Sequence, residues 1–154
     1  MMNWFLLLKF IHILSAILMI GGSTVNGMME LNLKSKKKMA ESDTISIIMS
    51  QVKLINNRIV LPSIISLLIT GLLFVFVYNY PITILWILTS LLLMILVFTF
   101  YFIGKKYEDR LQKEANDNAK SNKIEKTHKM IKIIGFSASL VILFILFLMI
   151  VKPI

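Results

Sequence analysis

The sequence predicts an all-α fold: an integral membrane four-helix bundle with both termini on the outer side. Three observations lead to this prediction. Hydrophobic residues make up 57% of the 154-residue chain, whereas an ordinary globular chain has about 45–50% apolar residues. The apolar residues gather in long uncharged stretches, and the charges crowd between them. No alternating apolar and polar pattern competes, so a membrane β-barrel is not expected.

Each apolar stretch is close to the ~20 residues with which a helix crosses the hydrocarbon layer. The predicted spans cover residues 4–24, 59–77, 82–103 and 131–151 of a single domain, 1–154. The first span starts without positive charge and carries Lys9 and His12 inside its apolar run. A signal peptide has the reverse arrangement, although Gly21-Gly22-Ser23 would suit a cleavage site.

The segment before the second span has a helical pattern of its own. Ser42 and Asp43 offer a helix cap, and apolar residues recur from Ile45 to Ile55 at helical spacing. This segment either lies on the membrane surface or prolongs the second span. Pro62 opens that span and is expected to disturb the helix after Arg58.

The remaining connections are predicted from their length and polarity. Residues 78–81 are few and uncharged, so spans two and three should form an antiparallel hairpin. Beyond span three, Asp109 with Lys113 and Arg110 with Glu114 are spaced for ion pairs on a helix. Residues 116–122 suit a polar turn before span four.

The positive charges predict the orientation. Lysine and arginine concentrate in two segments, residues 27–58 and 104–130, within a net charge of +9. Two spans separate these segments, so both lie on one side, which the positive-inside rule makes the cytoplasm. We therefore expect a multi-pass protein of the cell membrane whose cytoplasmic loops meet anionic lipid headgroups. The loops have no interleaved aromatic residues, so nucleic acid is not an expected partner.

Small and polar residues in the spans indicate which faces meet in the bundle, because lipid and protein interior are equally apolar. They recur at spacings of three and four and are expected to face inward: Ser15, Met19, Ser23, Asn26, Ser63, Ser66, Thr70, Ser90 and Ser139. Glu30 continues the stripe of the first helix, and Arg58 is its expected partner at the cytoplasmic end.

His12 is the candidate functional side chain. It lies about 12 Å along the helix from Trp4, which is expected at the outer interface. At that depth an imidazole either binds haem iron or another metal, relays protons, or bonds to Ser or Thr of a neighbouring helix. Lys9 either reaches the outer headgroups or meets a porphyrin propionate. Met94, another polar group, water or a second chain could supply the other axial ligand, and a homodimer would do so with a second His12. Met19 lies about 10 Å along the same helix, so it and His12 cannot bind one iron.

The sequence lacks the residues that several kinds of catalytic or metal-binding site require. There is no cysteine, so no disulfide, thiolate metal site or cysteine nucleophile exists. Phosphate-binding, hydrolase, zinc-protease and dinucleotide motifs are missing. No carboxylate lies deep in a predicted span, which argues against a carboxylate-based proton-coupled transporter. The ten methionines suit Cu(I) but are scattered.

Short motifs carry a family resemblance. The opening from Phe5 to Leu14 with Gly21-Gly22, the Pro62 to Leu73 segment and Trp86 resemble DUF2269, a family of predicted integral membrane proteins. That family is similar to HemJ-type protoporphyrinogen oxidases, whose Lys-x-x-His motif Lys9 and His12 match, and to CopD-like copper-resistance proteins. The oxidases carry a lysine shortly after the tryptophan of their third helix, and the sequence after Trp86 has none.

The resemblance implies haem b bound through His12, and the missing lysine argues against oxidase activity. The leading hypothesis is therefore a haem- or porphyrin-binding membrane protein. The alternatives are a structural or regulatory membrane protein without cofactor, in which His12 only packs helices, and a copper-handling membrane protein.

Overall fold

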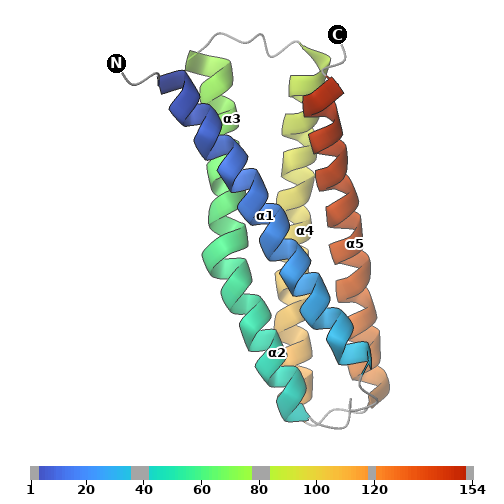
Figure 1. The fold of residues 1–154 in the computed structure, drawn as a ribbon. Helices are drawn as coiled ribbons and strands as arrows, with labels where there is room; N and C mark the ends of the chain where they lie inside the picture. The colour runs from blue at the N-terminus through green and yellow to red at the C-terminus, as the bar shows by residue number, and fades with distance from the viewer. Residues whose placement is uncertain (1–3, 36–41, 78–83, 118–120, 152–154) are drawn as a thin grey trace.

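A computed structural model of the chain describes residues 4–35, 42–77, 84–117 and 121–151 (Figure 1). These ranges contain helices and no strand: α1 (Trp4–Ser35), α2 (Ser42–Ile55), the π-helix η1 (Asn56–Val60), α3 (Leu61–Val77), α4 (Leu85–Asn116) and α5 (Ser121–Val151). Within them, four helical segments are long and apolar enough to cross a membrane. The predicted all-α fold with four spanning helices is confirmed.

The segment before the second span prolongs it rather than lying across the membrane surface. Helix α2 passes through η1 into α3 without a break, from Ser42 to Val77. The π-helix lies just before Pro62, which has no N–H and whose ring crowds the carbonyl of Arg58. A π-turn is one way for a helix to absorb such a disturbance. The π-helix includes Arg58, next to the place where the sequence predicted a disturbed helix.

The helices are longer than the predicted spans. Helices α1 and α4 each have 32 residues, about 48 Å at 1.5 Å per residue, against about 30 Å of hydrocarbon. The additional turns of α1 and α4 are C-terminal, and those of α5 precede residue 131. Residues 82 and 83 of the predicted third span, and the 78–81 connection, lie outside the described residues.

The two ends of the bundle differ in charge. Figure 1 shows that α1 begins and α5 ends at one end, while the opposite end holds the C-terminal turns of α1 and α4 and the first turns of α2 and α5. Both lysine-rich segments therefore share that opposite end, which we call the basic end.

The side chains pack in two hydrophobic clusters, one above the other. One lies at the basic end between α2, α4 and α5: Ile45, Met49, Val52, Leu111, Ala115, Ile124 and Ile131. The other lies along the predicted spans: Met19, Val60, Ile64, Leu67, Met94, Val97 and Ile142.

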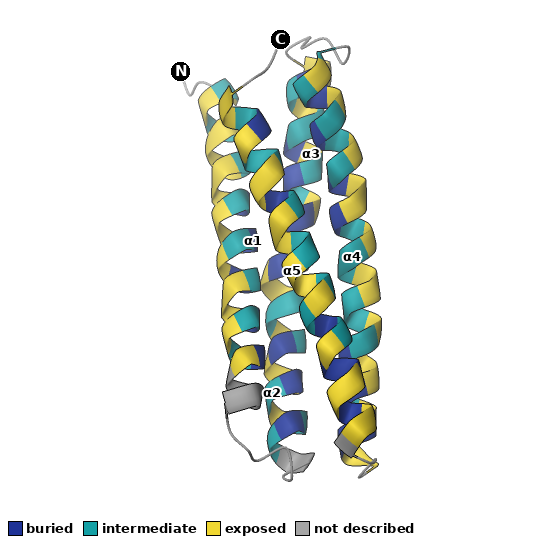
Figure 2. Ribbon diagram, turned by 90° about the vertical axis from the view of Figure 1, so that its right-hand side faces the viewer, coloured by how far each residue is buried: buried dark blue, intermediate teal, exposed yellow. Residues whose placement is uncertain are grey.

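The most completely buried side chains belong to the first cluster, where Met49 and Val52 have no exposed surface. Along the spans, large apolar side chains instead cover the outside of the bundle, as the yellow outer surfaces in Figure 2 show. Water around the basic end drives apolar groups inward, whereas lipid does not.

Candidate functional site

His12 lies on α1 against α3. Its Nδ1 is 2.6 Å from the Thr70 hydroxyl oxygen, and its ring meets Phe74 edge to face with centroids 5.8 Å apart. Gly71 lies beside the ring, and a Cβ at this position would be 3.8 Å from Cε1 of His12, an ordinary van der Waals contact. The bond to a threonine of a neighbouring helix is one of the arrangements that the sequence left open.

The hydrogen bonds of Thr70 bear on the tautomer of His12. The threonine hydroxyl also lies 2.7 Å from the Ser66 carbonyl, to which it donates. With its proton committed there, the hydroxyl oxygen can only accept, so Nδ1 of His12 is the donor. Nε2 then carries the lone pair. His12 is half-buried, and its Nε2 makes no hydrogen bond to any described residue.

The surroundings of His12 are apolar. Lys9 is exposed, one turn closer to the start of α1. Met19 is buried in the cluster along the spans, beside Met94, and about 10 Å along α1 from His12. A groove of about 520 Å³ runs between α1 and α3, lined mostly by aliphatic side chains with Ser66 and Thr70, and His12 does not line it.

The predicted inward-facing residues fall into three groups. Buried are Ser15, Met19, Asn26, Ser63, Thr70 and Ser90, and half-buried are Ser23 and Ser66. Ser15 donates to the Ser66 hydroxyl at 2.7 Å, parallel to the His12–Thr70 contact. The prediction that Ser139 faces inward is wrong. Ser139 is exposed and donates to the Gly135 carbonyl of its own helix, so it needs no partner in the bundle.

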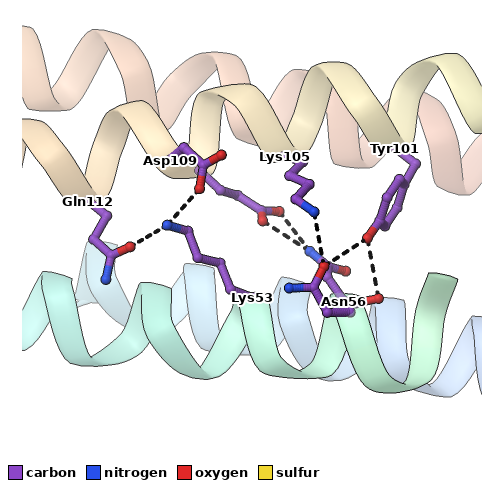
Figure 3. Close-up of polar contacts among 8 residues, drawn as sticks. Lys53, Asn56, Tyr101, Lys105, Asp109 and Gln112 are labelled. Carbon is purple, nitrogen blue, oxygen red and sulfur yellow. Dashed lines mark hydrogen bonds and ion pairs between the residues drawn. The ribbon is translucent and has the colours of Figure 1, made fainter.

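A second polar centre, which sequence reasoning missed, surrounds the π-helix (Figure 3). The Asn56 amide donates to both carboxylate oxygens of Glu108, at 2.8 and 3.1 Å. Asn26 donates to the Asn56 side-chain oxygen at 2.8 Å. These bonds join α1, η1 and α4 through side chains distant in the sequence.

The hydrogen bonds that run from Asn26 through Asn56 to Glu108, which we call the Asn56 relay, have one direction. Asn56 presents its amino group to the two carboxylate oxygens of Glu108 and its side-chain oxygen to the amino group of Asn26. Asn26 then presents its own amino group, and its buried oxygen is left without a partner among the described residues. Glu30, one turn along α1, is also buried.

Two ion pairs that the sequence predicted, one from helical spacing and one from a shared end of the bundle, are not found among the described residues. Asp109 pairs with Lys53 of α2 at 2.7 Å rather than with Lys113, and Lys53 also donates to Gln112 (Figure 3). Glu30 was expected to meet Arg58. Arg58 is exposed, whereas Glu30 is buried on α1 and lies within electrostatic range of Lys132 of α5. The Arg110–Glu114 pair is present, with a distance of 2.8 Å.

Glu108 was missed because it lies beyond the predicted end of the third span. Its signal was in the sequence. Tyr101 belongs to the inward face of that helix, and Glu108 lies one heptad later on the same face. His128, expected in a loop, is buried in α5 with Nε2 3.3 Å from the Glu30 carbonyl oxygen.

Comparison with known proteins gives one match. A family model described as predicted integral membrane protein (DUF2269) matches residues 6–153. Neither the curated proteins nor the solved structures include a significant match.

Proposed function

The chain belongs to DUF2269, a family of predicted integral membrane proteins, and from this premise we propose that it holds haem or a related porphyrin through His12. The observation that carries the proposal is the state of the imidazole. Nδ1 donates to Thr70, which leaves Nε2 with the lone pair and without a hydrogen bond to any described residue. Metal-binding histidines typically donate their second ring nitrogen to a neighbouring acceptor in this way.

The residues around His12 fit one axial ligand of a haem. Phe74 and Gly71 hold the ring from the side of α3, and Lys9 is exposed where it can meet an acidic propionate. Met19 belongs to the core cluster and does not share the site. The groove between α1 and α3 gives no support, because His12 does not line it.

In this proposal the chain orients and the cofactor reacts. Haem supplies electron transfer or oxygen chemistry, according to its ligands and surroundings. Thr70 keeps the proton of His12 on Nδ1, which leaves Nε2 basic.

The test is a visible absorption spectrum of the detergent-purified protein, oxidised and reduced, after expression with haem precursor. We expect a Soret band in the wild type and in His128→Gln, and its loss in His12→Ala. Thr70→Val should broaden or shift the band, because the ring loses its acceptor. A colourless wild type would rule out the haem proposal, and a bound-metal analysis would then test copper.

The second candidate is a structural role for the same residues. The His12–Thr70 and Ser15–Ser66 contacts join α1 to α3, and such bonds in lipid contribute about 1 kcal/mol each. A colourless protein in which His12→Ala lowers thermal stability would favour this candidate. A second chain supplying a second axial ligand would show as a haem-dependent dimer by size-exclusion chromatography.

We also propose that the basic end faces the cytoplasm of the cell, with both termini outside. The chain contains no cysteine, so single cysteines report their side without background. In intact cells an impermeant thiol reagent should label Trp4→Cys and spare Lys129→Cys. The reverse pattern would invert the topology.

A further inference from the structure

A small polar pocket lies between α4 and α5 at the basic end, apart from His12 and from the Asn56 relay. It measures about 290 Å³ and is lined by Tyr107, Arg110, Lys123, Lys126, Thr127 and Met130. Three of these six side chains are cations. One carboxylate, Glu114, is paired with two of the cations, which leaves an excess of two positive charges.

Glu114 positions the arginine rather than saturating it. It accepts from Nε of Arg110 at 2.8 Å and from the buried Thr127 hydroxyl at 2.7 Å. Lys123 is farther from this carboxylate, at 3.7 Å. The terminal amino groups of Arg110 therefore make no hydrogen bond to any described residue, and neither does Lys126. An arginine held by one edge presents the other as a fork for an anion.

The pocket begins at the depth of the lipid headgroups and continues just beyond them, where the long side chains of Arg110 and Lys126 can reach back to a phosphate. Tyr107 and Arg110 follow the predicted end of the third span, residue 103, by about 6–10 Å along the helix. Met130 directly precedes the fourth span, so α5 brings Lys126 to a similar depth. The headgroup layer is about 5–8 Å thick on each side of the hydrocarbon.

We propose that this pocket binds the phosphate group of an anionic membrane lipid. Arg110 binds two phosphate oxygens, Lys123 and Lys126 neutralise the charge, and the Tyr107 ring packs in the interfacial layer beside the glycerol. The proposal is independent of haem, because none of these residues contacts His12 or α3.

The experiment measures retention of phosphatidylglycerol by the full-length protein in detergent, by native mass spectrometry, with phosphatidylcholine in parallel. We expect selective retention of the anionic lipid. Lys126→Ala should weaken it about fivefold, from the ~1 kcal/mol per cation near a charged membrane surface. Arg110→Lys keeps the charge but loses the fork, and should also weaken it. Lys126 has no described partner, so its variant should fold normally.

The matched control is Lys129→Ala, which removes one charge from an exposed position on the same helix outside the pocket. It should leave retention nearly unchanged. Equal losses in Lys126→Ala and Lys129→Ala would mean diffuse attraction and would overturn the site. Inorganic phosphate that binds alone, and displaces the lipid at equal concentration, would assign the pocket to free phosphate and overturn the lipid.

Discussion

The Asn56 relay makes the sharpest prediction about stability. Replacing Asn56 with leucine keeps the approximate size of the side chain but removes both the donor to Glu108 and the acceptor from Asn26. Glu108 and Asn26 are each only 6% exposed. Water therefore cannot readily replace the lost bonds, and both groups would remain buried without their partner.

The expected loss follows from the bonds removed. Leaving a buried donor or acceptor without its partner costs about 1–3 kcal/mol. The two bonds of Glu108 share one donor residue, so we count them once. Asn56→Leu should therefore lower the free energy of unfolding by about 3 kcal/mol.

The assay is reversible unfolding in mixed micelles, followed by far-ultraviolet circular dichroism. Asn57→Leu is the matched control, because Asn57 is the next residue of η1, is exposed, and accepts only longer bonds from Lys105 and Tyr101. It should change stability by no more than about 0.5 kcal/mol. Equal stability of the two variants would refute the relay, and so would additivity between Asn56→Leu and Glu108→Gln.

Two further predictions concern packing, each with an internal control. A methyl group at Gly22 would lie 2.9 Å from Cγ2 of Val60, whereas Gly21 has open space around it. Gly22→Ala should therefore destabilise the protein by about 1–3 kcal/mol through overpacking. Gly21→Ala is the control and should show no loss of stability in thermal unfolding. Met49→Ala should cost about 2–5 kcal/mol by leaving a cavity at a side chain with no exposed surface, while Ile47→Ala, 62% exposed on the same helix, should stay near wild type. Similar melting temperatures within either pair would contradict the packing described.

The sequence predicted the spanning helices well because length and hydrophobicity in themselves satisfy the membrane. It also indicated that α2 is helical, since Ile45, Met49 and Val52 follow the helical period of a water-facing segment. The sequence left open whether that helix lies on the membrane surface or continues into α3 past Pro62. The structure shows that it continues, through the π-helix η1.

The candidate site was predicted only in part. His12 was chosen as the lone histidine of a span, and its bonding to a Ser or Thr of another helix was one of the open alternatives. The identity of Thr70 was not predictable, because several hydroxyls share that helix face. Ser139 was assigned inward from its spacing, yet it satisfies its own hydroxyl and faces outward.

By itself the sequence determined that this chain crosses the membrane, how many times, and which segments share a side, because these follow from local composition and from counting spans. Only the tertiary structure decided that Glu108 meets Asn56 and that Asp109 meets Lys53. Those contacts depend on the rotation and register of helices far apart in the chain. In lipid the inner and outer faces are equally apolar, so hydrophobic periodicity does not record that rotation.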